Sequence, residues 1–170
     1  MKHRREFLKI TSAAAITAAA GTTTAGIVRA DDGNAKEFLG AWKSIHTLPL
    51  PPEFFREYLA FADGGFLHET NSFLHSASNV DFSFYHLPNV VNASDGFGTW
   101  ARVGNGVIRA AFRKMLFDGS RQNFGELRVN GTLRSDGTKL TAEWHVVVVD
   151  PLEKVLLDFG AATSEGTRIL

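Results

Sequence analysis

The histidine and glutamate residues of this 170-residue chain are its best candidates for chemistry. Two groups stand out: His68 precedes Glu69, and Glu143 stands two residues before His145. A carboxylate held against an imidazole fixes the tautomer of the ring and raises its basicity, as acid–base catalysis requires. We predict His68, Glu69 and His145 as catalytic residues that face a shared apolar cavity. The alternative is that both glutamates are solvated on an outer face, because glutamate is seldom buried without a partner.

Other kinds of catalytic and metal site lack their usual motifs. The chain has no cysteine, so disulfides and thiolate ligands are excluded. It contains neither His-x-His nor His-Glu-x-x-His, and we expect no metal and no cofactor, although a site built from distant strands is not excluded by spacing alone. There is no Gly-x-Ser-x-Gly and no phosphate-binding glycine motif, so we expect neither a serine hydrolase nor a nucleotide site.

Aromatic residues are abundant, with 3 Trp, 2 Tyr and 14 Phe. Most of them suit a hydrophobic core. An apolar, aromatic-lined cavity with a few polar groups is also typical of a small-molecule site. The residues that we predict to line such a cavity are Trp42, His46, Tyr58, Tyr85, Trp100, Phe112 and Trp144.

The elements that position these residues are β-strands. Extended runs rich in Val, Phe, Leu and Thr alternate with Gly, Asn and Asp turns, which is typical of an antiparallel meander. We predict an all-β, eight-stranded antiparallel up-and-down barrel, because closure removes exposed strand edges. An open sandwich is the competing architecture. The predicted strands are 37–46, 55–61, 66–73, 98–103, 107–117, 124–134, 140–149 and 155–159, with 166–170 closing the chain. The segment 74–97 lacks the pattern, and we expect a lid or a packed connection there.

Strand alternation predicts which faces point inward. In 107–117 the inward set is Ile108, Ala110, Phe112 and Leu116, and in 124–134 it is Leu127, Val129 and Leu133 with Gly125 and Gly131. If Trp42 is internal, Ser44 and His46 lie on the same side. Either His68 or Glu69 faces inward, and the alternation leaves the direction of His145 open.

The first thirty residues have the parts of an export signal: a basic start, a weakly apolar middle and a small-residue end. Arg4-Arg5-Glu6-Phe7-Leu8-Lys9 resembles the twin-arginine (Tat) signal motif in full, and Arg4, Arg5, Phe7 and Leu8 carry the resemblance. It implies a bacterial or archaeal protein that the Tat translocase exports in a folded state. The exported protein would then be periplasmic or secreted. We expect cleavage after Ala30, leaving residues 31–170 as one barrel domain. The alternative is a basic helix of a cytoplasmic protein.

The charge distribution argues against nucleic acid as a partner. The 18 basic and 18 acidic residues balance, but five of the bases and one of the acids lie in the first thirty residues. The remaining chain is therefore mildly acidic and has no basic cluster beside its aromatics. The apolar run of the signal is too short and too polar for a stable membrane span.

Gly40-Ala41-Trp42, together with Arg168 near the C-terminus, resembles the signature of the calycin (lipocalin-like) superfamily. The resemblance implies that Trp42 closes one end of a barrel and that Arg168 packs across it, so Gly40, Trp42 and Arg168 are predicted structural residues. In shape the predicted barrel is also similar to the allene oxide cyclase-like barrels, but no catalytic motif of theirs matches this chain.

Three functions remain open from the sequence. The first is an exported barrel, monomeric or homodimeric, that binds a small apolar or aromatic molecule. The second is a cofactor-free isomerase, cyclase or lyase of the same shape, using His and Glu as acid and base. The third is an interaction module with a filled barrel. Inward histidines with a carboxylate favour the enzyme, whereas an apolar lining favours a carrier.

Overall fold

The computed structural model describes residues 35–49, 52–72, 90–120 and 122–169. The predicted signal, with Arg4, Arg5, Phe7 and Leu8, lies outside these residues, and so does Tyr85. Within the described ranges, no helix is long and apolar enough to cross a membrane.

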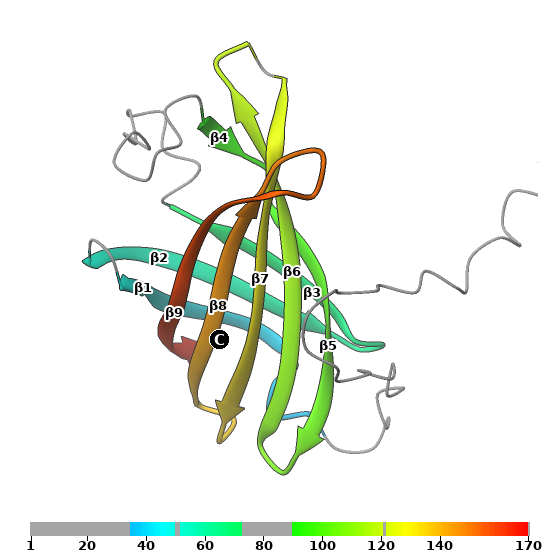
Figure 1. The fold of residues 1–170 in the computed structure, drawn as a ribbon. Helices are drawn as coiled ribbons and strands as arrows, with labels where there is room; N and C mark the ends of the chain where they lie inside the picture. The colour runs from blue at the N-terminus through cyan, green and yellow to red at the C-terminus, as the bar shows by residue number, and fades with distance from the viewer. Residues whose placement is uncertain (1–34, 50–51, 73–89, 121, 170) are drawn as a thin grey trace, which may run out of the picture.

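The described strands form one antiparallel sheet that closes into a barrel (Figure 1). Its strand order is β4-β6-β5-β3-β2-β1-β9-β8-β7, and pairing of β6 with β7 completes the ring. Eight strands make the barrel and β4 is an addition to β6, so the predicted eight-stranded antiparallel barrel is confirmed. The strands are β1 (Gly40–Pro49), β2 (Pro52–Ala62), β3 (Phe66–Asn71), β4 (Val90–Ala93), β5 (Gly96–Gly104), β6 (Val107–Asp118), β7 (Asn123–Ser135), β8 (Lys139–Val149) and β9 (Val155–Arg168).

The largest differences from the sequence prediction are at β4 and β9, and β1 lies three residues later than the predicted 37–46. β4 lies inside the segment expected to be irregular, and it pairs with the end of β6 that β5 leaves free. Ser94 joins β4 to β5. Its backbone N–H donates to the backbone oxygen of Met115 on β6, and its hydroxyl oxygen accepts from the Met115 N–H, at 2.9 Å each. β9 is one strand of 14 residues rather than two short pieces, because Gly160 takes a φ of 70° and lets the strand bend without ending.

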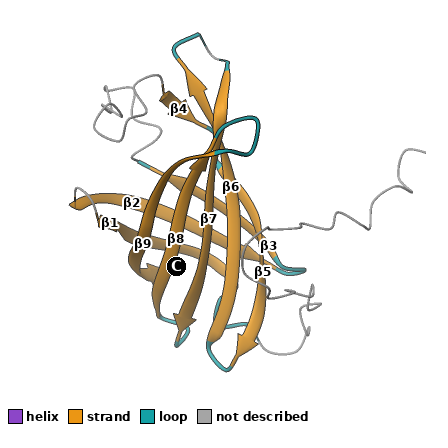
Figure 2. Ribbon diagram, in the orientation of Figure 1, coloured by secondary structure: helices purple, strands orange, loops and turns teal. Residues whose placement is uncertain are grey.

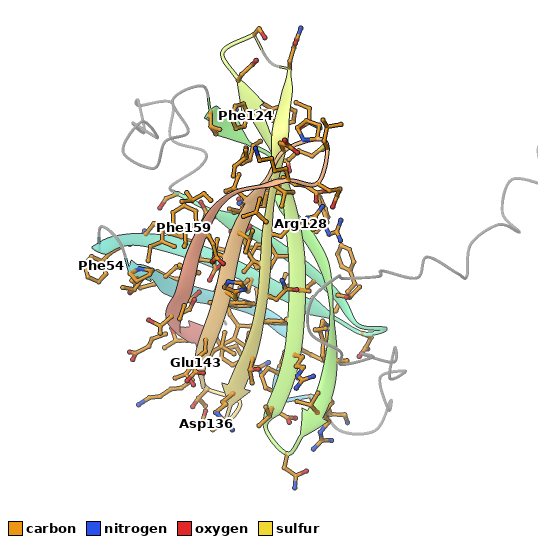
Figure 3. All side chains as sticks on the ribbon, viewed as in Figure 1. Phe54, Phe124, Arg128, Asp136, Glu143 and Phe159 are labelled. Atoms are coloured by element: carbon orange, nitrogen blue, oxygen red, sulfur yellow. The ribbon has the colours of Figure 1, made fainter. Side chains whose placement is uncertain are left out.

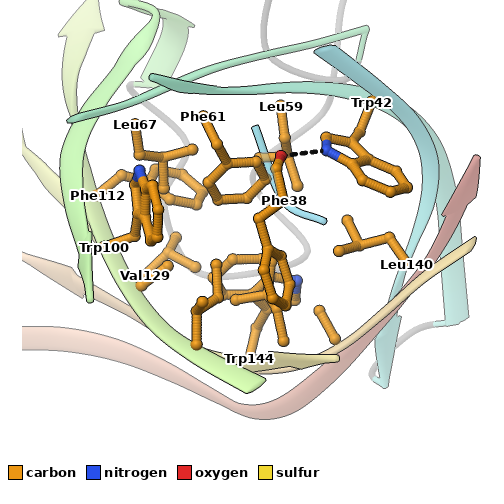
Figure 4. Packing of buried hydrophobic residues seen from close by; sticks show 14 of the residues in the cluster. Phe38, Trp42, Leu59, Phe61, Leu67, Trp100, Phe112, Val129, Leu140 and Trp144 are labelled. Atoms are coloured by element: carbon orange, nitrogen blue, oxygen red, sulfur yellow. Dashed lines mark hydrogen bonds between the residues drawn. The ribbon is translucent and has the colours of Figure 1, made fainter. Parts of the chain in front are cut away.

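The described chain consists of strands joined by loops and turns (Figure 2). The two-residue alternation sends one face of these strands into the barrel. The residues predicted inward on 107–117 and 124–134 are buried, except Leu127 and Gly131, which lie on the same inward face and are half-buried. Rings meet at near-perpendicular angles, as between Phe61 and Trp100 at 6.1 Å and between Phe112 and Trp144 at 5.7 Å. The main cluster in Figure 4 includes Phe38, Trp42, Leu59, Phe61, Leu67, Trp100, Phe112, Val129, Leu140 and Trp144.

Trp42 and Arg168 close the end of the barrel where β1 begins and β9 ends. The indole Nε1 of Trp42 donates a hydrogen bond of 2.7 Å to the backbone oxygen of Phe38 (Figure 4). Cζ of Arg168 lies 4.7 Å from the centre of the Trp42 ring system, the stacked arrangement that the calycin resemblance implied. Gly40 has a φ of 107°, a conformation that glycine adopts without strain. The guanidinium also donates to the backbone oxygens of Glu37, Leu39 and Gly137, at 2.6, 2.6 and 2.8 Å.

Asp136 holds the turn between β7 and β8. Its Oδ1 accepts hydrogen bonds from the backbone N–H groups of Lys139 and Thr138 and from the Thr138 hydroxyl, each 2.8 Å long. These bonds stabilise the ionised form, the backbone bond from Lys139 most, and lower the pKa of Asp136 from 3.8 to about 2.

We expect Asp136→Asn to lower the melting temperature by a few degrees at neutral pH, because the amide cannot supply the charge that strengthens these bonds. A depressed carboxyl pKa stabilises the folded state above 3.8, and this contribution is lost as the pH falls toward about 2. The melting temperatures of the unaltered protein and of Asp136→Asn should therefore converge as the pH falls through this range. A difference that stays constant down to pH 2 would contradict the prediction.

Candidate functional site

A belt of polar side chains crosses the apolar interior of the barrel. All of its members occupy inward strand positions and are buried. Burial of the charged members is rare unless they have partners. Ser44 and His46 follow Trp42 at two-residue spacing on β1, so the prediction that they share its side is confirmed. The belt consists of Ser44 and His46 on β1, Glu57 on β2, Glu69 and Asn71 on β3, Lys114 on β6 and Ser164 on β9.

Glu57 is the centre of one half of the belt. Its Oε2 accepts hydrogen bonds from the hydroxyls of Ser44, at 3.1 Å, and Ser164, at 3.3 Å. The same oxygen lies 3.7 Å from Nδ1 of His46. Cross-strand pairing makes these contacts, since Ser44 lies opposite Glu57 and His46 lies opposite Ser164 in the sheet.

The hydrogen-bond network assigns the tautomer of His46. Trp144 Nε1 donates to Ser164 Oγ at 2.8 Å, and we assign the single hydroxyl hydrogen of Ser164 to Glu57, because a carboxylate oxygen accepts. Nδ1 of His46, 3.1 Å from Ser164 Oγ, must then donate to it, because two lone pairs would otherwise face each other. Nδ1 therefore carries the proton of the neutral ring. The lone pair of Nε2 has no hydrogen-bond partner among the described residues.

Glu69 and Lys114 form the other half of the belt. Lys114 Nζ lies 2.7 Å from Glu69 Oε2, and Asn71 Nδ2 donates to Glu69 Oε1 at 2.7 Å. Burial raises the pKa of Glu69, because the loss of hydration outweighs the attraction of the Lys114 ammonium, and the nearby Glu57 carboxylate acts in the same direction. Gly96 leaves the space for this carboxylate, since a Cβ there would lie 2.6 Å from Glu69 Oε2.

An apolar cavity of about 40 Å³ lies between the belt and the barrel end near β4. Three polar residues, His46, Glu57 and Asn71, reach it from the belt. Phe159 belongs to its wall and lies at the opposite end of the barrel from the Asp136 turn (Figure 3). The remaining lining residues are Leu48, Phe55, Val90, Phe112, Leu116, Leu127, Val129, Val146 and Val148.

The predicted catalytic residues do not come together. Glu69 faces inward and is fully buried, but His68 and His145 face outward, with side chains 37% and 55% exposed. Each outer histidine has an aspartate beside it: His68 Nε2 lies 3.4 Å from Asp95, and His145 Nε2 lies 2.8 Å from Asp158. The structure thus separates both imidazoles from the interior by the thickness of the sheet.

The predicted lining residues divide into three groups. His46 and Phe112 line the cavity. The second group packs within the core and consists of Trp42, Trp100 and Trp144. The indole N–H of Trp42 donates to the Phe38 backbone oxygen, and that of Trp144 donates to the Ser164 hydroxyl. The indole N–H of Trp100 donates to backbone oxygens of β2 and β3. Tyr58 faces outward and is 40% exposed, and Tyr85 lies outside the described residues.

Glu57, Lys114 and Ser164 were missed by the sequence prediction. The alternation contained a signal for two of them: Glu57 shares the face of Leu59 and Phe61, and Lys114 stands between Phe112 and Leu116 on the predicted inward face. A charged residue in such a position is normally taken to mark a break in the pattern. Only its partner from another strand explains its burial.

Comparisons with protein-family models, with curated proteins and with solved structures found no match to this chain. Among the described residues, no group of three or more His, Asp or Glu side chains is placed to hold a metal ion.

Proposed function

We propose that the barrel binds one small molecule with an apolar body and a polar end in its interior cavity. The observation that carries the proposal is the cavity itself, with apolar walls and a few polar groups converging at one end. The polar end of the ligand meets His46 and Glu57. Its apolar body lies toward Leu127, Val148 and Phe159.

The volume of the cavity limits the enclosed part of the ligand. About 40 Å³ is roughly three times the 10–15 Å³ that a cavity needs to hold one water molecule. The enclosed part is therefore a few heavy atoms, such as a carbonyl with the short carbon chain beside it. A linear or narrow ligand satisfies this limit better than a broad ring system.

A tryptophan that fills the cavity tests the proposal. We expect Leu116→Trp to weaken the binding of hexanol at least about tenfold, or 1.4 kcal/mol, in isothermal titration calorimetry. Leu116 is buried and lines the cavity, whereas its neighbour Met115 faces outward and is half exposed. Met115→Trp is thus the matched control and should bind hexanol as the unaltered protein does. Equal binding by both variants, with circular dichroism confirming that each is folded, would place hexanol outside the barrel.

The natural ligand is accessible to native mass spectrometry of protein purified from its own cells. A bound molecule that is lost on denaturation supports the proposal and gives the chemical class. Purified protein that is empty and binds no hexanol supports the competing function, an interaction module with a filled barrel. Export by the Tat translocase and cleavage after Ala30 remain part of the proposed function, supported by the motif of Arg4 and Arg5.

A further inference from the structure

We propose that His46 is an acid–base catalyst that moves a proton between two carbons of a small unsaturated ketone held in the cavity. The proposal rests on the proposed binding function and adds a reaction to it. Its basis is one arrangement: a buried imidazole that lines a cavity with largely apolar walls, whose Nδ1 is held by Ser164 and Glu57 and whose Nε2 has no hydrogen-bond partner in the described part of the chain.

The position of His46 suits a base. Its side chain is 4% exposed, and it is stacked on Phe55 with the ring centres 4.7 Å apart, so the ring cannot turn freely. With the proton on Nδ1, the lone pair of the ring is on Nε2, and the ring lines the cavity that holds the ligand. A general base must present such a lone pair within hydrogen-bond reach of the proton that it removes.

The belt stabilises the protonated ring. When His46 accepts a proton, the new imidazolium lies 3.7 Å from Glu57 Oε2. A carboxyl oxygen at this distance stabilises a positive charge that develops on the ring, which a purely apolar wall could not do.

The reaction is a 1,3-proton shift and needs no oxidant or reductant. His46 Nε2 removes a proton from the carbon between the carbonyl and the alkene, and the electron pair of that C–H bond enters the dienolate. The imidazolium then returns a proton to the terminal alkene carbon, where the dienolate electrons form the new C–H bond. The ketone is restored with its alkene conjugated, and Nε2 regains its lone pair. Substrate and product are isomers.

Glu57 is a positioning residue in this scheme. It holds the hydroxyls of Ser44 and Ser164, and through Ser164 it fixes the tautomer of His46. In Glu57→Gln the amide can donate toward Nδ1, which moves the ring proton to Nε2. Nitrogen-15 NMR of the histidine ring should report this exchange of tautomers, a change that a loss of stability alone would not produce.

Allyl methyl ketone is the probe for the reaction. We expect the full chain to convert it to the conjugated propenyl methyl ketone faster than buffer alone, as followed by ultraviolet absorbance and, in deuterium oxide, by deuterium entering the terminal carbon. His46→Ala should lower the protein-dependent rate about 100-fold or more, the usual contribution of a general base. Added imidazole should restore part of the rate by occupying the space that the ring leaves. Glu165→Gln, an exposed change on β9, should keep the full rate.

Calorimetry with the same ketone separates the two proposals. If the ketone does not bind in the cavity, the proposed binding function fails for this probe class, and the catalytic proposal falls with it. If it binds, is displaced by the Leu116→Trp change, and is not converted, only the catalytic proposal is overturned. A loss of rate in His68→Gln or His145→Gln while His46→Ala keeps full activity would also overturn it, because the base would then lie on the outer face.

Discussion

Replacement of Lys114 by methionine lowers the free energy of unfolding by about 3–5 kcal/mol at neutral pH, the usual cost of removing one partner of a buried ion pair. The Lys114 and Glu69 side chains are both fully buried, and their charged atoms lie 2.7 Å apart. Methionine has a similar volume to lysine, so the packing changes little. The loss comes from the Glu69 carboxylate, which stays in the interior without the ammonium.

The deficit of Lys114→Met depends on pH in a defined direction. The pKa of Glu69 is already raised from 4.5 by burial, and removal of the ammonium raises it further. A carboxyl whose folded pKa exceeds its unfolded value binds more protons when folded, so the variant loses stability as the pH rises from about 4.5 through the folded pKa. Below that range the carboxyl is protonated in both states, and the deficit shrinks.

Urea unfolding of a double variant checks the cause. Glu69→Leu combined with Lys114→Met removes both charges, and we expect it to recover most of the lost stability, since apolar replacements of a whole buried pair are often neutral or stabilising. Lys139→Met, an exposed change on β8, should alter stability by less than about 0.5 kcal/mol. If the double variant is less stable than Lys114→Met, the buried carboxylate is not the source of the loss.

Trp42→Ala is the second large change, with an expected loss of about 3–5 kcal/mol. Trp42 is fully buried at the closed end, and its replacement leaves a cavity, removes the bond to Phe38 and takes away the surface on which Arg168 lies. Trp42→Phe keeps an aromatic surface and should lose less. Urea unfolding monitored by far-ultraviolet circular dichroism measures both.

A double-mutant cycle with Arg168→Met isolates the stacking. We expect a coupling between Trp42 and Arg168 of about 0.5–2 kcal/mol, the range for a cation over an aromatic face from exposed to desolvated sites. Arg168→Met alone also loses the bonds to the backbone oxygens of Glu37, Leu39 and Gly137, so its total effect exceeds the coupling. Additive effects of the two changes would show that Arg168 acts through these backbone bonds only.

The barrel could be predicted from local pattern because its causes are local. Glycine, asparagine and aspartate turns end the strands at nearly the predicted residues, and alternation assigned Ile108, Phe112 and Val129 to the interior. The strand Val90–Ala93 escaped prediction, since four residues are too few to show alternation. Its pairing with β6 is what makes it a strand.

The site could not be predicted because its causes are distant in sequence. On β3 the two faces are almost equally apolar, so alternation does not choose between His68 and Glu69. Glu69 faces inward because the fold gives its carboxylate a partner, Lys114 on β6. The hydroxyl of Ser164 contacts both His46, which is 118 residues away in the sequence, and Glu57, which is 107 residues away.

The sequence by itself determined the strands of the barrel, their turns and the pairs of alternating faces, because each depends on neighbours one or two residues away. The tertiary structure alone decided which polar residues share the interior and which imidazole reaches the cavity. The physical reason is that a charge enters an apolar interior only when partners from other strands compensate its lost hydration, and closure of the barrel brings those partners together.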